Sequence, residues 1–180
     1  MPKYISNYKI FVPTIIVFIA DQLTKYLISV NMNPVQRDSI NIISHYLKFT
    51  YIINPGAAFG IEVNNTIVYS ILFLVTLLIT AYLIYYLFSV RNKMNYESFS
   101  LSLILGGALG NLLDRTFTLF EIAGYTGVID FIDIGLKDES AWRWYTFNIA
   151  DMSVSIGICL YLLCSYLYSN SKEKIIDENS

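Results

Sequence analysis

Residues 67–90 form an uninterrupted run of 24 residues without a charged side chain. At about 1.5 Å per residue, a helix of this length can cross the hydrocarbon core of a bilayer, which is about 30 Å thick. Three further apolar segments cover about residues 10–30, 99–113 and 146–168. The segment 99–113 is the shortest, because its 15 uncharged residues would rise only about 22 Å as a helix. The pattern predicts an all-α integral membrane protein, a single membrane domain over residues 1–180 with four transmembrane helices.

The composition agrees with a membrane protein. Of the 180 residues, 55% are hydrophobic and only 14% are charged, against about 25% in a typical soluble domain. The mean hydropathy is +0.51. The net charge is -2, and the sequence contains no stripe of basic residues that would neutralise phosphates. The sequence therefore argues against nucleic acid as a partner.

The first apolar segment has two interpretations. Lys3 and Lys9 precede it, as basic residues precede the apolar core of a secretory signal. However, apolar residues continue over 23–30, and no small-x-small cleavage pattern follows the core. These features favour an uncleaved first membrane helix.

The basic residues predict an orientation. Six of them lie in three short segments that would share one side of the membrane: Lys3, Lys9, Arg91, Lys93, Lys172 and Lys174. Five are spread over the two longer segments on the other side, about 31–66 and 114–145: Arg37, Lys48, Arg115, Lys137 and Arg143. The positive-inside rule then places both termini in the cytoplasm and the longer segments outside.

Three carboxylates are predicted to lie at similar depths. Counted from the cytoplasmic helix ends at about 1.5 Å per residue, Asp21 lies roughly 16 Å, Asp114 about 22 Å and Asp151 about 25 Å up its span. Acids are costly inside hydrocarbon and mark functional sites by default. We therefore expect one site in the outer half of the membrane, open toward the extracytoplasmic face.

The external segments contain strand patterns. Leu47, Phe49, Tyr51 and Ile53 alternate with other residues at the period of a strand, and the sequence Asn-Pro-Gly over 54–56 then forms a turn. An extended segment over 127–134 would place Val128, Asp130 and Ile132 on one face. A small extracytoplasmic β-sheet over the helix bundle is expected.

Asp130 and Asp151 lie on different elements and are able to converge. Two carboxyl groups a few ångströms apart do not both ionise easily, so one of them holds a proton near neutral pH. The ionised group can take a proton from water while the protonated one donates to a carbonyl oxygen, which is the chemistry of aspartic proteases. The structural alternative is that each Asp caps a helix or binds local backbone.

The other polar residues near these acids also have structural interpretations. Asp21 and Lys25 are four residues apart and can pair on one helical face. Asp114 and Arg115 can form an ion pair or an anchor at the membrane edge. Three amides near presumed outer helix ends or turns can cap helices or hold carboxylates: Asn54, Asn111 and Asn148.

Other chemistries have weaker support. The single histidine, His45, has no neighbouring nucleophile pattern, and no cluster with metal-ligand spacing occurs. Gly106 and Gly110 lie inside an apolar span, where small residues four apart let helices approach closely. No metal and no cofactor are expected.

Five short blocks occur in order along the chain: 21–25 (DQLTK), 54–60 (NPGAAFG), 106–115 (GGALGNLLDR), 128–132 (VIDFI) and 147–151 (FNIAD). Together they resemble the lipoprotein signal peptidase family, also called signal peptidase II. The resemblance implies a membrane aspartic endopeptidase of the bacterial cytoplasmic (inner) membrane. It would remove the signal peptide from prolipoproteins, cutting just before a lipobox cysteine that carries diacylglycerol.

The resemblance also implies roles for individual residues. Asp130 and Asp151 match the catalytic pair. Eight residues match supporting or substrate-binding positions: Asp21, Lys25, Asn54, Gly56, Asn111, Asp114, Arg115 and Asn148. The implied partners are prolipoprotein substrates, membrane lipid and inhibitors of the globomycin type, and four spans suffice for a monomer to work.

The sequence departs from the family in one place, because the stretch over 116–127 is longer than expected. It either closes over the substrate or pads the end of the bundle.

Three alternatives remain for such a chain. A proton-coupled transporter would distribute its acids through the membrane depth and show repeat symmetry, and neither feature is seen. A lipid acyltransferase would pair His45 with a nearby acid. A membrane scaffold explains the spans but not the acids.

Overall fold

The computed structural model describes residues 8–36, 38–44, 46–55, 66–90, 96–135 and 143–178. Most of these residues are helical. The helices are α1 (Val12–Asn31), preceded by a 3₁₀ turn at Tyr8–Phe11, then α2 (Thr66–Val90), α3 (Tyr96–Leu119) and α4 (Ile149–Glu178). A short 3₁₀ turn, Ile122–Gly124, follows α3.

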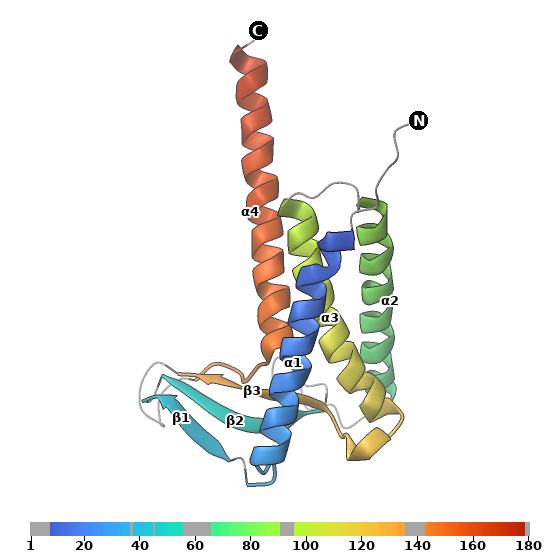
Figure 1. Ribbon diagram of the computed structural model, residues 1–180, viewed down its shortest axis with the longest axis vertical. Coiled ribbons are helices and arrows are strands. Elements are labelled where there is room, and N and C mark those ends of the chain that lie inside the picture. The colour runs from blue at the N-terminus through green and yellow to red at the C-terminus, as the bar shows by residue number, and fades with distance from the viewer. Residues whose placement is uncertain are drawn as a thin grey trace.

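Three strands form a small antiparallel sheet at one end of the bundle. They are β1 (Ser39–Ile43), β2 (Leu47–Asn54) and β3 (Val128–Ile134), in the order β1-β2-β3. Figure 1 shows the sheet lying across the end at which α1 finishes and α4 starts. The mainly helical fold with a small sheet is confirmed, and the predicted strands correspond to β2 and β3.

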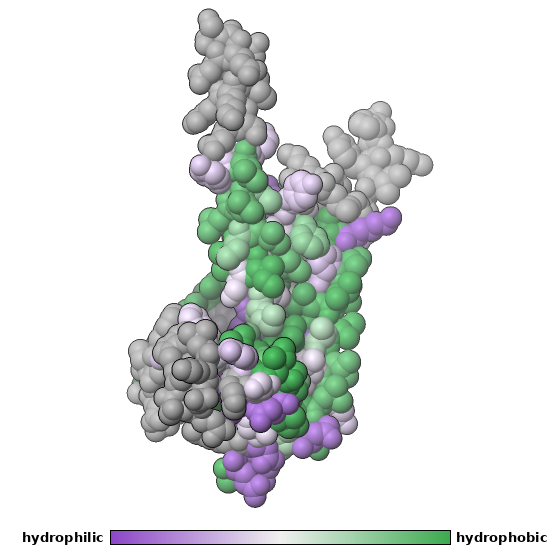
Figure 2. Space-filling model, turned by 90° about the vertical axis from the view of Figure 1, so that its left-hand side faces the viewer, coloured by the Kyte–Doolittle hydropathy of each residue, from purple (hydrophilic) through white to green (hydrophobic). Residues whose placement is uncertain are grey.

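Three helical segments of the described chain are long and apolar enough to cross a membrane: Tyr8–Asn31, Tyr69–Val90 and Ile149–Tyr168. Their outward faces are mainly hydrophobic, as the green surface along the bundle in Figure 2 shows. Hydrophilic residues gather at the sheet end and near the opposite end. This distribution is typical of a protein whose helices contact lipid.

Helix α3 is more polar than its neighbours because it lies among them. It packs against α1, α2 and α4 and buries Ser98, Ser102, Asn111 and Asp114. The hydroxyl of Ser102 donates to the carbonyl of Ile10 at 2.6 Å, so one polar group satisfies another. Because these polar side chains are buried within the bundle, α3 can be less apolar than the other three helices.

Two glycines of α3 allow the neighbouring helices to approach closely. A Cβ at Gly106 would collide with Val17 of α1, and a Cβ at Gly107 would collide with the backbone of α4 at Ala150. The close-packing role predicted for Gly106 is therefore confirmed. The same helix continues for five residues beyond Asp114, although the apolar run ends there.

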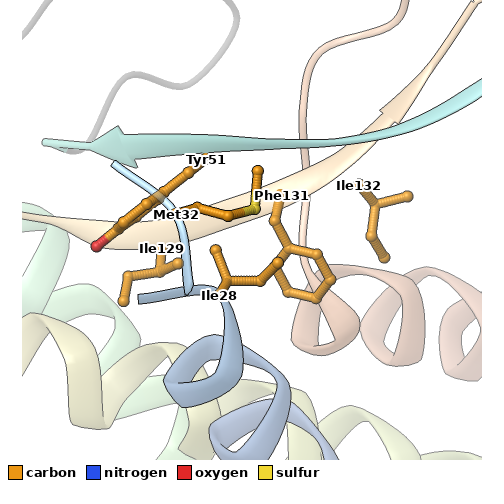
Figure 3. Packing of buried hydrophobic residues seen from close by; sticks show 6 residues of the cluster. All are labelled: Ile28, Met32, Tyr51, Ile129, Phe131 and Ile132. Atoms are coloured by element: carbon orange, nitrogen blue, oxygen red, sulfur yellow. The ribbon is translucent and has the colours of Figure 1, made fainter. Parts of the chain in front are cut away.

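A compact apolar cluster joins the sheet to the end of α1. It contains Ile28 and Met32 from α1 and residues of β2 and β3: Tyr51, Ile129, Phe131 and Ile132 (Figure 3). These side chains fill the space between α1 and the strands. The cluster fixes β3, and with it Asp130, against the helix bundle.

Candidate active site

Asn148 and Asp151 form a reciprocal cap at the start of α4. The side-chain oxygen of Asn148 accepts from the backbone N–H of Asp151 at 3.0 Å. A carboxylate oxygen of Asp151, Oδ2, accepts from the backbone N–H of Asn148 at 3.2 Å. This is the capping-box arrangement, which satisfies N–H groups that have no partner inside a helix. The cap fixes the Asp151 carboxylate at the first turn.

The residue before this cap pairs with β3. Phe147 forms an isolated antiparallel bridge with Ile132, and its carbonyl accepts from the N–H groups of Phe131 and Ile132 at 3.1 and 2.7 Å. The bridge places Asn148 beside Asp130. The backbone between β3 and α4 therefore brings the two acids to one place.

Asp130 is held by two amides. Asn148 Nδ2 donates to its Oδ1 at 2.7 Å, and Asn54 Nδ2, from the last residue of β2, donates to its Oδ2 at 3.0 Å. The side chain is only 3% exposed. Asn148 thus contacts both acids, Asp130 through its side chain and Asp151 through its backbone.

A buried lysine lies behind the pair. Lys25 Nζ is 2.7 Å from a carboxylate oxygen of Asp21 and 2.7 Å from one of Asp114. All three side chains are at most 1% exposed. Asp21 also accepts from the backbone N–H of Ala150 at 2.9 Å, so the ion cluster holds the first turn of α4.

Asn111 connects this ion cluster to the acids. Its Oδ1 accepts from Lys25 Nζ at 3.0 Å and from Asn148 Nδ2 at 3.1 Å. Its Nδ2 donates to Asp151 Oδ1 at 2.8 Å. Because Lys25 and Asn148 both occupy the oxygen, the amide group of Asn111 must face Asp151.

The two acids differ in environment. Burial and, to a smaller extent, the negative charge of Asp151 raise the pKa of Asp130 from 3.8 to about 7, although the hydrogen bonds from Asn54 and Asn148 and the charge of Lys25 lower it. Asp151 is less buried and accepts hydrogen bonds from the side chain of Asn111 and the backbone of Asn148. Such a pair can hold one proton near neutral pH.

Asp151 opens onto a cavity of about 340 Å³. The cavity is lined by Asp151 and by five largely apolar neighbours: Trp144, Phe147, Met152, Ser155 and Ile156. A larger cavity, of about 460 Å³, lies near the start of α3 and has no part of the acid pair in its wall. Within the described ranges, no group of three His, Cys, Asp or Glu side chains is arranged to hold a metal ion. The smaller cavity is thus where a bound molecule can reach the carboxylate of Asp151.

Known proteins are similar to this chain. The family model for signal peptidase (SPase) II matches residues 13–167. The chain belongs to the signal peptidase II family. The lipoprotein signal peptidase of Thermodesulfovibrio yellowstonii is 36% identical over 166 residues, covering 92% of this chain and 97% of that one. That of Blochmanniella pennsylvanica is 41% identical over 118 residues, 64% of this chain and 65% of its own.

A solved structure agrees with the fold. A bacterial membrane enzyme superposes with a TM-score of 0.71 and 32% identity, covering 91% of this chain and 90% of that one. Signal peptidase II is a family of proteases, and its membership here, with the three apolar helices, identifies a multi-pass membrane protein.

Most of the signal peptidase II positions predicted from the sequence meet in this site. Asn54, Asn111 and Asn148 all bind carboxylates, and only Asn148 also caps a helix. The predicted Asp21–Lys25 pair is confirmed. The pairing of Asp114 with Arg115 was wrong, since the carboxylate of Asp114 binds Lys25 instead.

One predicted position, Arg115, is not brought to the acids. The Nε atom of Arg115 is buried without a hydrogen-bond partner, and its carbonyl accepts from the hydroxyl of Tyr69 at 3.4 Å. Gly56 lies outside the described residues. Arg115 therefore does not help to define the acid pair.

Sequence reasoning missed Gln22 and Gly110 as parts of the site. Gln22 Nε2 donates to the carboxylates of Asp21 and Asp114 at 3.1 and 3.3 Å and to the carbonyl of Gly110 at 3.2 Å. A Cβ at Gly110 would collide with the Asp21 carboxylate. The available signal for Gln22 was its place in the sequence, directly after Asp21 on the same helix.

Gly110→Ala is expected to lower both stability and activity. Alanine favours helix over glycine by about 0.5–1 kcal/mol, but the added methyl group must displace Asp21 from Lys25 and Ala150. Overpacking of this kind costs typically about 1–3 kcal/mol. Thermal unfolding in detergent and substrate turnover measure the effect, and a melting temperature equal to or above that of the wild type would contradict the assigned contact.

Proposed function

We propose that the chain is an aspartic endopeptidase that removes the signal peptide from diacylglyceryl-modified prolipoproteins, cutting just before the lipidated cysteine. The observation that carries the proposal is the pair Asp130 and Asp151, which share Asn148 as a hydrogen-bond donor. Family membership supports the removal of prolipoprotein signal peptides. The acid pair supplies the chemistry.

In the proposed reaction, Asp130 is the protonated member and Asp151 the ionised one. Asp151 takes a proton from a water molecule as its oxygen attacks the scissile carbonyl carbon, and Asp130 gives its proton to the carbonyl oxygen. The tetrahedral intermediate then collapses as the peptide C–N bond breaks. The leaving nitrogen takes the proton from Asp151, and Asp130 recovers its own from the intermediate. The pKa of Asp130, about 7, supports this assignment.

The cavity beside Asp151 supports a substrate that carries lipid. Met152 and Ile156 follow Asp151 along the outer surface of α4 and are 38% and 48% exposed. Moving acyl chains out of a bilayer costs about 0.8 kcal/mol per CH₂. An enzyme that cuts beside a lipidated cysteine must therefore keep its acids next to the hydrocarbon, as this position does if α4 spans the membrane.

In the proposed topology all four helices, α1 to α4, span the membrane, and α3 is shielded from lipid by its neighbours. Both termini then face the cytoplasm of a bacterial cell, and the acids lie toward the extracytoplasmic side of the cytoplasmic membrane. Arg115 and Gly56 are proposed to contact substrate rather than the acids. Globomycin-type inhibitors would occupy the substrate site, and the enzyme would work as a monomer.

A cleavage assay tests the proposal. Purified full-length enzyme is mixed with one prolipoprotein in two forms, with and without diacylglycerol on the lipobox cysteine, each in the presence and absence of EDTA. We expect cleavage of the modified form only, unaffected by EDTA, with the new N-terminus at the cysteine. Failure of well-folded enzyme to cut the modified form would refute the proposal and favour proton transport, which a flux assay in vesicles would then detect.

The value of kcat/KM is expected to decline on the alkaline side of about pH 7. Activity should fall as pH rises through about 7, because Asp130 then loses the proton that it donates. A rate that keeps rising between pH 7 and pH 9 would be inconsistent with Asp130 as the acid.

A further inference from the structure

The larger cavity, about 460 Å³, lies at the other end of the bundle from the acids. Its wall comes from the start of α3 and from the middle of α4: Tyr96, Glu97, Tyr161, Cys164, Ser165 and Tyr168. On α4, Tyr161 and Tyr168 lie ten and 17 residues after Asp151, which is about 15 and 26 Å along the helix. In Figure 1 the start of α3 is at the end opposite the sheet. The cavity is therefore separate from the site of cleavage.

One carboxylate, that of Glu97, faces this cavity and forms no ion pair with a described residue. The hydroxyl of Tyr86 donates to Glu97 Oε1 at 3.0 Å. In the part of the chain that the structure describes, no Lys or Arg side chain pairs with Glu97, and its Oε2 accepts no hydrogen bond. Glu97 is partly buried, so its charge is incompletely screened by solvent. The cavity offers a negative charge to whatever enters it.

Aromatic rings form much of the remaining wall. Tyr96, Tyr161 and Tyr168 line the cavity, and the first and last are 79% and 73% exposed. The faces of aromatic rings attract cations, and ammonium groups are often bound by several rings with a carboxylate. A ligand whose only charged group is an anion, such as free phosphate or a carboxylate, would be repelled by Glu97. The combination of rings and one acid thus selects a ligand with an ammonium group.

The position in the bundle indicates where that ligand comes from. If α4 spans the membrane from Asp151 onward, a distance of about 15–26 Å places the cavity in the far half of a core about 30 Å thick and close to its surface. Tyrosines are enriched at that depth, where lipid headgroups begin. A lipid whose acyl chains lie along α3 and α4 can reach the cavity with its headgroup.

We propose that the cavity between the start of α3 and α4 binds the ammonium headgroup of an aminophospholipid such as phosphatidylethanolamine. Glu97 is the counter-ion, and Tyr96, Tyr161 and Tyr168 surround the ammonium group. The lipid belongs to the leaflet opposite the cleavage site. This leaflet assignment rests on the proposed topology, whereas the binding itself does not depend on the proposed reaction.

Native mass spectrometry of the purified full-length protein tests the site. The protein is titrated in detergent with phosphatidylethanolamine, with the same lipid N-acetylated to remove its charge, and with phosphatidylglycerol. We expect one molecule of phosphatidylethanolamine to bind about tenfold more tightly than either of the others, since only it brings a cationic hydrogen-bond donor to the carboxylate. Equal binding of the three lipids would overturn the proposal.

Two variants locate the lipid. Glu97→Gln keeps an acceptor for Tyr86 but lacks the charge, and it should abolish the preference for phosphatidylethanolamine. Tyr168→Leu should weaken binding by about two- to fivefold through the loss of one ring. Glu121→Gln, an exposed acid after α3, is the matched control and should bind as the wild type does.

Cleavage measured in parallel separates this proposal from the proposed function. Glu97→Gln should cut substrate at the rate of the wild type, because Glu97 takes no part in the site of cleavage. A Glu97→Gln protein that melts normally and still prefers phosphatidylethanolamine would refute the assigned site. If the wild type shows no protease activity, the proposed function fails, but the lipid titration still decides whether the cavity binds phosphatidylethanolamine.

Discussion

The Asp151→Asn enzyme is expected to cleave diacylglyceryl-modified prolipoprotein about 10⁴-fold more slowly than the wild type, the upper range for loss of a general base. Asparagine has nearly the shape of aspartate but cannot take a proton from water. The variant should still fold. It loses one hydrogen bond of the α4 cap, which costs about 1 kcal/mol. Turnover of purified enzyme, with melting temperature as the measure of folding, gives the result.

Asp130→Asn is expected to be equally inactive, yet more stable than the wild type at alkaline pH. The folded-state pKa of Asp130, about 7, lies above its ordinary value of 3.8. The stability contributed by the protonated group is therefore complete below about pH 4 and is lost as pH rises through 7. The wild type should melt at lower temperature at pH 8 than at pH 5, and the variant should show less of this loss.

Asp133→Asn provides the matched control. Asp133 lies on the same strand, but its carboxylate accepts from Arg143 Nε at 2.7 Å and from the hydroxyl of Thr50 at 3.1 Å, on the sheet and away from Asp151. This variant should keep cleavage activity within a few-fold of the wild type. Substantial activity in Asp130→Asn or Asp151→Asn would overturn the two-acid mechanism.

Lys25→Met is expected to destabilise the protein by about 3–5 kcal/mol, the usual cost of leaving a buried charge without its partner. Asp21 and Asp114 are almost fully buried, and Lys25 is the cation that both of them bind. Asn111 would also lose a donor, and with it one restraint on the amide that faces Asp151. Thermal unfolding in detergent should show a large drop in melting temperature, with a fall in turnover.

A triple variant separates charge from shape. Asp21→Asn and Asp114→Asn combined with Lys25→Met remove all three charges while they keep similar volumes. Replacing a whole buried ion cluster by neutral groups is often close to neutral for stability. We expect the triple variant to melt well above Lys25→Met alone. If both variants melt together, the loss in Lys25→Met comes from packing and not from unpaired carboxylates.

The sequence predicted the helices better than the sheet. Hydropathy located α1, α2 and α4 because lipid-facing helices are apolar over their whole surface. Strand β1 was not predicted, since all five of its residues are exposed and therefore show no alternation between a buried and an exposed face. The continuation of α3 past Asp114 was not predicted either. The apolar run ends at polar residues, but these are buried within the bundle and the helix continues beyond them.

For the site, depth alone predicted that Asp21, Asp114 and Asp151 meet, and Lys25 binds two of the three. The contact of Asp21 with the Ala150 backbone joins residues 129 positions apart and depends on where α4 begins. The contact of Asn148 with Asp130 depends on the bridge between Phe147 and Ile132. No residue pattern encodes such backbone registers, so the carboxylate partners could be predicted as a group but not one by one.

The bridge between Phe147 and Ile132 has a consequence for growth in changing membranes. Asp130 and Asp151 are joined through the backbone pairing of Phe147 with Ile132 and through Asn148, not through the packing of one long helix on another. Bacterial membranes thin and thicken with temperature and lipid supply, and spanning helices tilt in response. A tilt of α2, which carries none of the residues that bind the two acids, leaves this backbone pairing unchanged. Processing of lipoproteins should therefore continue at a steady rate across bilayers of different thickness.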